Sequence, residues 1–486
     1  MKFKNKLFLI SFCEGAAVMA AEICGAKLLA PFFGSSLYVW SSVMAITLGG
    51  LASGYFIGGR LSQKENKQYI LFYLLLGAFC FLALMPYLSK FIFVIAYNIP
   101  LISAVILSAI LIIFPAMLLM GTTSPLLISL LTSNSNESGL NSGKIYSIST
   151  VGGILSTFLC GFYFIPTVGI SFTLVGFSLL LALVSLLLVK KKSNKQISIS
   201  LITILSVCLV SLNTLPKSKN CIYKTDGILG KIEVKDENLN SNQTSRILLF
   251  NNIIQSEMDL NTKQNKSNYI SIFENNLNYF QKGKALVLGL GGGLSSNILV
   301  KKGYSVTGIE FDNRIIEIAK NYFYLDSSVK TICSDARLYI NTCTTKYDLV
   351  IIDLYKAEEQ PSHVLTLESL NTLKGMLTKN GVIIINNHGY LEGEKGLGSR
   401  CLIATLKKCN FHIKICSTND DENYRNLLIL ASTNQIKDTL INEYTPTGPI
   451  DSETINTDNR PVLEKLNAEA NKAWRVNYLK NYILIN

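Results

Sequence analysis

Charged residues are scarce in this sequence, and acidic residues are nearly absent from its first part. Only 16% of the 486 residues are charged, while 49% are hydrophobic. Residues 1–215 contain 13 Lys or Arg but only 4 Asp or Glu, whereas residues 216–486 contain 32 and 29. This contrast excludes a single water-soluble globule and a disordered chain, and it indicates two parts that occupy different solvents.

The cysteines lack the spacing of a metal site or of a disulfide framework. None of the 11 cysteines forms a C-x-x-C pair, so a secreted disulfide scaffold is excluded and no metal site is expected. Five lie in apolar stretches and are predicted to be small buried side chains: Cys13, Cys24, Cys80, Cys160 and Cys208. The net charge of +12 does not indicate nucleic-acid binding, because most of the excess lies between apolar runs.

Long apolar runs fill the first part. A helix needs about 20 apolar residues to cross a bilayer. Residues 1–215 are therefore predicted to form a transmembrane helical domain of six or seven helices, the seventh being the weakest candidate. The candidate stretches are Leu7–Phe32, Leu37–Gly59, Tyr69–Leu88, Leu101–Leu131, Ile145–Ile165, Ile170–Val189 and Ile197–Asn213.

Basic residues before the first candidate helix, and after the second and sixth, predict a cytoplasmic amino terminus. Six crossings would return the chain to the cytoplasm, whereas a seventh would place the second part outside. Within the second stretch, Gly50, Gly54 and Gly58 predict close packing against another helix. Charges at membrane depth are costly, so Glu22 fits either a bound cation such as a polyamine or a polar contact between helices.

Short β-rich runs alternate with helix-length segments from Lys284 onward. This alternation predicts an α/β Rossmann-like domain over residues 284–486, with a parallel sheet whose ligand lies at the carboxyl ends of the strands. Residues 216–283 are predicted to be a linker and a small β-hairpin region. The expected strands are Ala285–Leu288, Tyr304–Ile309, Val329–Cys333, Asp348–Ile352 and Gly381–Asn386.

A glycine loop follows the first of these strands. Gly289, Gly291 and Gly293 allow a tight turn and a close approach of backbone to a nucleotide. Glu310, 21 residues after Gly289, ends the next strand, where a carboxylate accepts hydrogen bonds from both ribose hydroxyls. A dinucleotide loop requires Gly or Ala at the position of Leu294, so an S-adenosyl-type ligand is favoured over a dinucleotide.

Two further carboxylates follow predicted strands. Asp335, in the segment Ser334–Ala336, is placed to accept from an adenine amino group, and capping a helix is the alternative. Asp353 closes an apolar strand, where burial beneath the sheet would be costly for an unpaired charge. It is the candidate general base or ammonium-binding residue.

These motifs, together with several shorter ones, form a known pattern. The segment from Cys221 to Glu464 resembles the spermidine synthase (polyamine aminopropyltransferase) family, and residues 1–215 resemble the membrane domain that precedes it in some bacterial members. The additional matching segments are Gly227–Val234, Leu249–Gln255, Tyr269, Pro361–Thr366, Thr457–Val462 and, in the membrane part, Glu22–Pro31 and Trp40–Gly59.

The resemblance implies transfer of an aminopropyl group from decarboxylated S-adenosylmethionine, bound as a co-substrate, to an amine such as putrescine. It implies that Asp353 attracts the amine and accepts its proton. The glycine loop, Glu310, Asp335 and Ala336 would bind the donor, and Gln255 with Tyr269 would line the substrate pocket. It also suggests a homodimer formed through the soluble domain.

The sequence departs from the family pattern at the amine site. The family usually has an acid at Leu294, a second acid at Lys356 and a histidine at Ile270. Each unit charge at about 4 Å changes the interaction with an amine by roughly 1–4 kcal/mol. Glu358 or Glu359 is a candidate for compensation, although a solvated loop is the favoured position for both. The nucleotide site therefore matches the family while the amine site is altered.

Three functions fit these observations. The first is an aminopropyltransferase with a rearranged acceptor site. The second is an S-adenosylmethionine-dependent methyltransferase, because loss of the acid at Leu294 suits a donor that keeps its carboxylate. The third is a non-enzymatic, transporter-like or nucleoside-sensing membrane protein. The expected location is a cell membrane, with the soluble domain in the cytoplasm, because adenosyl donors are made there.

Overall fold

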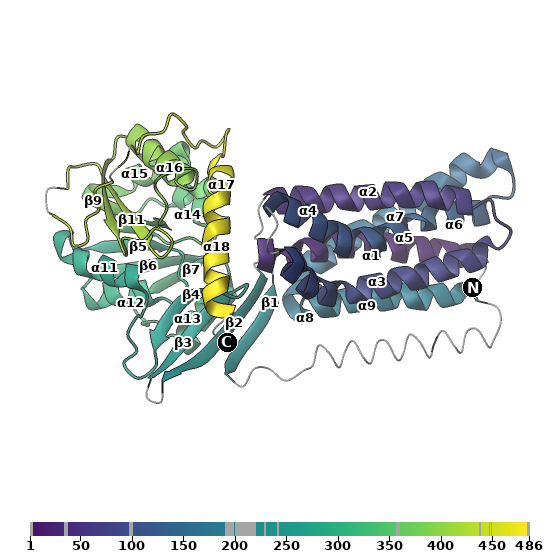
Figure 1. Cartoon of the computed structure of the whole chain (residues 1–486), viewed down its shortest axis with the longest axis horizontal. Helices are drawn as coiled ribbons and strands as arrows, with labels where there is room; N and C mark the ends of the chain where they lie inside the picture. Colours follow the sequence, from purple (N-terminus) through teal and green to yellow (C-terminus); the bar gives the residue numbers. More distant parts are fainter. Residues whose placement is uncertain are drawn as a thin grey trace. The chain divides into compact units, whose positions relative to one another are not determined.

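The computed structural model describes most of the chain, and Figure 1 traces it. The residues divide into two compact units. The first comprises Met1–Lys219 and Thr225–Lys231, and the second comprises Asn220–Lys224 and Ile232–Asn486. The described residues are 3–33, 37–96, 101–189, 199, 220–227, 230–240, 243–355, 360–436, 439–446, 448 and 450–483.

The first unit is helical. Its helices are α1 (Phe3–Phe33), α2 (Leu37–Leu61), α3 (Lys67–Ala96), α4 (Leu101–Ile112), α5 (Phe114–Gly121), α6 (Thr123–Leu131), α7 (Ser138–Leu159), α8 (Ile165–Val168) and α9 (Ile170–Ser185). Among the described residues, six helical stretches are long and apolar enough to cross a membrane. They are Phe3–Ala30, Val39–Leu61, Lys67–Ser89, Phe114–Leu131, Ser138–Val168 and Ile170–Leu188.

One of the expected membrane stretches is divided into several helices, and another lies almost entirely outside the described residues. The stretch Leu101–Leu131 is divided into α4, α5 and α6, with Pro115 in the first turn of α5. Proline cannot donate the backbone hydrogen bond that a continuous helix would make there. The stretch Ile197–Asn213 lies outside the described residues apart from Ile199, so the number of crossings stays a prediction.

Close helix packing explains the glycine row of α2. A Cβ atom on Gly54 would overlap the carbonyl oxygen of Leu118, and one on Gly58 would lie 2.7 Å from the oxygen of Thr122. The predicted packing role of these glycines is confirmed. Between α1 and α7, Glu14 accepts a hydrogen bond from Ser149 Oγ over 3.1 Å, so a polar contact links these helices.

The glycine row leads to a stability prediction. Gly54→Ala should lower the melting temperature of the detergent-solubilised chain, because its Cβ atom must displace the backbone of a packed helix. Gly59→Ala is the matched control, because nothing lies within 4 Å of a Cβ atom there. That control should be neutral or stabilising, since Ala is favoured over Gly in a helix by about 0.5–1 kcal/mol. Equal melting temperatures for the two variants would contradict the packing role.

The described strands form two sheets. The smaller has the order β1-β2-β3-β4, and β2, β3 and β4 pair antiparallel. The larger has the order β10-β11-β9-β8-β5-β6-β7. The strands are β1 (Cys221–Gly227), β2 (Gly230–Asn240), β3 (Gln243–Phe250), β4 (Ile253–Asp259), β5 (Lys284–Leu288), β6 (Ser305–Glu310), β7 (Lys330–Cys333), β8 (Tyr347–Ile352), β9 (Leu377–His388), β10 (His412–Ser417) and β11 (Asn426–Ser432).

The larger sheet confirms the predicted Rossmann-like fold. The five expected strands are β5 to β9, which pair in parallel in the order β9-β8-β5-β6-β7. The antiparallel strands β10 and β11, which extend this sheet beyond β9, were not predicted. The accompanying helices are α11 (Asn268–Asn276), α12 (Leu294–Lys301), α13 (Asn313–Tyr322), α14 (Ala336–Thr342), α15 (Leu367–Gly375), α16 (Leu397–Lys408), α17 (Leu463–Leu466) and α18 (Ala468–Ile483).

The parallel strands bring the candidate site residues to one edge of the sheet. All six residues of the central strand β8 are buried, as their apolar run predicts for a strand covered on both faces. The carboxyl ends of β5, β6, β7 and β8 meet at the same edge. Glu310 is the last residue of β6, and the residues that follow the other three strands are the glycine loop, Ser334–Ala336 and Asp353.

Candidate functional site

The glycine loop adopts a backbone that other residues rarely accept. Gly289, Gly291 and Gly293 have φ angles of 91°, 52° and 74°, in the left-handed region. A Cβ atom on Gly289 would overlap the carbonyl oxygen of Asp353, at the end of the neighbouring strand. Gly289 N also donates to Ile309 O over 2.9 Å. The loop is therefore a turn without side chains that packs against the ends of β6 and β8.

Ser256 supports the loop from the smaller sheet. Its hydroxyl accepts a hydrogen bond from Gly292 N over 2.8 Å, and a Cβ atom on Gly292 would lie 2.9 Å from Ser256 Cβ. Ser256 was not predicted as a site residue, because an isolated Ser in a β-rich segment carries no signal of a contact 36 residues away.

Glu310 lies beside the glycine loop at the end of β6. Its carboxylate accepts from Leu290 N over 3.1 Å and from Asp312 N over 3.2 Å. Burial raises the pKa of Glu310, and the hydrogen bonds from surrounding backbone amides oppose that shift. The side chain thus connects the loop to the start of α13. The predicted bond to ribose hydroxyls stays a prediction.

Asp335 is half-buried and caps the start of helix α14. One oxygen accepts from Leu338 N over 3.0 Å, as the capping alternative requires. The other oxygen lies 3.5 Å from His363 Nε2. Ala336, the first residue of α14, is buried. Capping occupies one oxygen only, so the adenine role stays a prediction.

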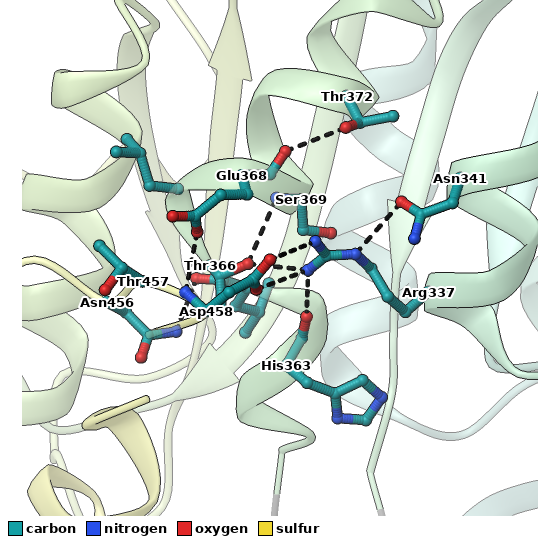
Figure 2. Close-up of polar contacts among 12 residues, drawn as sticks. Arg337, Asn341, His363, Thr366, Glu368, Ser369, Thr372, Asn456, Thr457 and Asp458 are labelled. Atoms are coloured by element: carbon teal, nitrogen blue, oxygen red, sulfur yellow. Dashed lines mark hydrogen bonds and ion pairs between the residues drawn. The ribbon is translucent and has the colours of Figure 1, made fainter. Parts of the chain in front are cut away.

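A cluster around Arg337 fixes the segment that carries His363, as Figure 2 shows. Arg337 Nη1 donates to His363 O over 2.7 Å and to Thr366 Oγ1 over 2.8 Å. Its two terminal nitrogens bind Asp458 over 3.0 and 2.7 Å. The Arg337 hydrogen bonds hold the pKa of Asp458 below its ordinary value. An exposed ion pair contributes only about 0–1 kcal/mol, so the main effect of the cluster is to join the distant segment Thr457–Val462 to α14.

Asp353 is held by two hydrogen bonds. Tyr269 Oη donates to Asp353 Oδ2 over 2.7 Å, and Asn386 Nδ2 donates to Oδ1 over 2.9 Å. Burial raises the pKa of Asp353, and these two hydrogen bonds oppose the shift. Burial, followed by the negative charge of Asp353, also raises the pKa of Tyr269 well above its ordinary value, which keeps the phenol a neutral donor.

A second group of side chains orients Asn386. Tyr355 Oη and Gln360 Nε2 both donate to Asn386 O, over 3.1 and 2.6 Å. Asn426 Nδ2 donates to Asn386 Oδ1 over 3.0 Å, which leaves the amide nitrogen of Asn386 to face Asp353. Asn386 was not predicted as a site residue, although its position near the end of β9, beside β8, is the signal that could have identified it.

The remaining predicted pocket positions are only partly placed. Gln255 lies on β4, and its Nε2 atom donates to Ile254 O over 3.4 Å. Ile270 and Leu294 are both buried. Lys356, Glu358 and Glu359 lie outside the described residues. The structure therefore brings Tyr269 to Asp353 and leaves the compensation for the altered amine site untested.

The fold defines a Rossmann-like α/β domain with a glycine loop and acids at adjacent strand ends. Residues 275–414 match the family described as the spermine/spermidine synthase domain. The carboxyl-terminal part of the chain is therefore similar to this family over those residues, as the motifs indicated.

Individual relatives cover the chain to different extents. It is 24% identical over 438 residues to polyamine aminopropyltransferase 2 of Aquifex aeolicus, covering 85% of this chain and 84% of that one. It is 33% identical over 110 residues to a polyamine aminopropyltransferase of Vibrio vulnificus, covering 21% of this chain but only 37% of that one. An N-terminal histidine N-methyltransferase of Emericella nidulans is 25% identical over 154 residues, which are 30% of this chain and 28% of that one.

Solved structures include a probable spermidine synthase from Corynebacterium glutamicum. It has a TM-score of 0.38 and 17% sequence identity, and the match covers 46% of this chain and 82% of that one.

Proposed function

We propose that the second unit is an aminopropyltransferase that moves an aminopropyl group from decarboxylated S-adenosylmethionine to an amine such as putrescine. The observation that carries the proposal is the setting of Asp353. This carboxylate lies at the end of β8, directly beside the glycine loop, and is oriented by Tyr269 and Asn386. Two relatives that are named polyamine aminopropyltransferases also support the assignment.

The proposed reaction is a single displacement. The lone pair of a neutral amine attacks the carbon beside the sulfonium sulfur, and the carbon–sulfur bond breaks as the new carbon–nitrogen bond forms. The electron pair stays on sulfur, so neutral methylthioadenosine leaves. The amine nitrogen gives its proton to Asp353. The raised pKa of Asp353 favours this step, because a carboxylate with a higher pKa is a stronger base at neutral pH.

The donor would bind across the ends of β5, β6 and β7. The glycine loop would leave space for the nucleoside, Glu310 would accept from the ribose hydroxyls, and Asp335 with Ala336 would contact adenine. Gln255 and Tyr269 would bound the amine. Positioning alone contributes greatly to such reactions, since a bound near-attack geometry replaces a bimolecular encounter.

We further propose that the protein resides in a cell membrane as a multi-pass protein, with the second unit in the cytoplasm. Six helical stretches of sufficient length support the membrane location. The cytoplasmic placement rests on the site of donor synthesis, because the basic loops orient only the amino terminus and the number of crossings stays a prediction. A homodimer formed through the second unit is part of the same proposal.

Methyl transfer from S-adenosylmethionine is the second candidate function. Leu294 is buried at the start of α12, where an acid would be expected to bind the aminopropyl ammonium of a decarboxylated donor. One relative, the N-terminal histidine N-methyltransferase, is named for this chemistry.

Product analysis of the full chain in detergent separates the candidates. The chain should be incubated with an amine and with either decarboxylated or ordinary S-adenosylmethionine. We expect methylthioadenosine from the decarboxylated donor, in an amount equal to the aminopropylated amine. Release of S-adenosylhomocysteine from the ordinary donor would instead establish methyl transfer. Tight nucleoside binding without either product would leave a sensing or transport role.

A further inference from the structure

The carboxyl-terminal helix α18 lies beyond the matched family domain and contacts several segments of the second unit. Residues 275–414 form the matched domain, whereas α18 covers Ala468–Ile483 and is the yellow helix in Figure 1. Tyr478 Oη accepts a hydrogen bond from Ile254 N on β4 over 2.9 Å. Asn477 Nδ2 donates to Asn423 Oδ1, between β10 and β11, over 3.2 Å. The helix therefore joins the smaller sheet to the antiparallel end of the larger one.

Aromatic rings extend from α18 to the end of β9. The rings of Trp474 and Tyr478 are stacked, with centroids 5.2 Å apart and an interplanar angle of 14°. The Trp474 ring lies 6.0 Å from that of His388, and His388 lies 5.4 Å from the ring of Tyr355. His388 is buried, with a relative exposure of 4%. Four rings from three segments thus form one continuous series.

This series reaches the candidate catalytic carboxylate. Tyr355, at its inner end, donates to the carbonyl of Asn386, whose side chain donates to Asp353. At its outer end, Tyr478 binds the backbone next to Gln255, a predicted substrate residue. The aromatic rings therefore extend from the residue next to Gln255 to the residue that donates its amide to Asp353.

Aromatic surfaces suit the chemistry of an aliphatic amine. Ring faces attract ammonium groups, by about 0.5–2 kcal/mol depending on desolvation. Rings also cover methylene groups, and each buried CH₂ contributes about 0.8 kcal/mol. Such a surface binds an alkylammonium group without placing a second carboxylate beside it.

We propose that α18 completes the acceptor-amine site, with Trp474 and Tyr478 forming an aromatic wall against the alkylammonium chain. This inference rests on the proposed aminopropyltransferase function and assigns to that site a helix outside the matched domain. Trp474 and Tyr478 determine which amine binds, while the donor binds at the opposite side of Asp353.

The small number of tryptophans gives a direct test. The chain has 2 tryptophans, Trp40 in the membrane unit and Trp474 in α18. In Trp40→Phe, the emission of Trp474 is measured alone while the full chain in detergent is titrated with putrescine, spermidine or methylthioadenosine. We expect a saturable change in emission with an amine and none with methylthioadenosine alone. No response to any amine, or a response to the nucleoside alone, would overturn the proposal.

Steady-state kinetics provide a second measurement. Trp474→Ala should raise the amine KM at least tenfold by the cation–π and methylene contributions above, with an unchanged donor KM. Trp474→Phe, which keeps an aromatic face, should restore much of the amine affinity. The emission titration in Trp40→Phe keeps the proposal testable if the alanine variant does not fold. Tyr478→Phe removes only the hydroxyl bound to Ile254 and should change the amine KM less than Trp474→Ala does.

The two proposals fail in different ways. An amine-dependent change in Trp474 emission without any aminopropyl transfer would contradict the proposed reaction and leave the amine site on α18 standing. Aminopropyl transfer with an unchanged amine KM in Trp474→Ala and Trp474→Phe would support the reaction and overturn the role of α18.

Discussion

Asp353→Asn is expected to abolish aminopropyl transfer while the affinity for methylthioadenosine stays nearly unchanged. The amide has almost the same shape as the carboxylate but cannot accept the proton from the attacking amine. General-base catalysis contributes about 10²–10⁴-fold in enzymes, and we expect a loss of kcat in that range. Single-turnover rates and calorimetric binding of methylthioadenosine to the full chain in detergent measure the two quantities separately.

Asp348 offers a matched control on the same strand. It lies near the opposite end of β8 and accepts hydrogen bonds from Lys284 N over 2.8 Å and Thr378 Oγ1 over 2.9 Å. Asp348→Asn should therefore lower the melting temperature and leave kcat per folded molecule unchanged. If Asp353→Asn loses nucleoside affinity as strongly as turnover, Asp353 has a structural role and the proposed mechanism is wrong.

Local patterns predicted the framework of the second unit. Strands β5 to β9 were predicted within a few residues of their ends, apart from the longer β9, because each is a short β-rich run between helix-length segments. The glycines at 289, 291 and 293 permit the left-handed backbone that these residues adopt, although residue type alone does not decide it, because Gly292 has no positive φ. The order of the parallel strands then brings Glu310 and Asp353 to one edge, without any information on side chains.

Contacts between distant segments could not be predicted in this way. Tyr269 and Asp353 are 84 residues apart, and the family resemblance indicated a shared pocket but not their hydrogen bond. The support of Gly292 by Ser256, the Arg337–Asp458 pair and the contacts of α18 depend on packing between separate segments. Capping of α14 was predicted as the alternative to adenine binding for Asp335, because an aspartate side chain suits either role.

Hydropathy predicted the long apolar helices of the first unit but not their internal breaks. The single stretch Leu101–Leu131 reads as continuous because all of its side chains are small, apolar or hydroxyl-bearing. Pro115 and the turn at Thr122 divide it, since backbone hydrogen bonding rather than hydrophobicity decides where a helix ends. Amphipathic periodicity gives no help there, because both faces of such a helix are apolar.

Gly289→Ala is expected to remove nucleoside binding and turnover together. The left-handed backbone strains any residue other than glycine, at a cost of about 1–2 kcal/mol. In addition, the new Cβ atom would overlap the carbonyl oxygen of Asp353, so the end of β8 or the loop must move. Because both parts of the site adjoin this contact, we expect methylthioadenosine affinity and kcat/KM each to fall about 100-fold, as a displacement of about 1 Å at an active site does.

Gly303→Ala separates strain from overlap. Gly303 has a φ angle of 90°, nearly the same as the 91° of Gly289, but nothing lies within 4 Å of its Cβ position. Gly303→Ala should lower the melting temperature by the amount that backbone strain alone causes, and its nucleoside affinity should be unchanged. Equal nucleoside affinity in the two variants would mean that the loop does not adjoin the donor, since Gly303 lies in the turn between α12 and β6 and not in the glycine loop. A selective loss in Gly289→Ala would instead tie donor binding to the absence of a side chain at that turn.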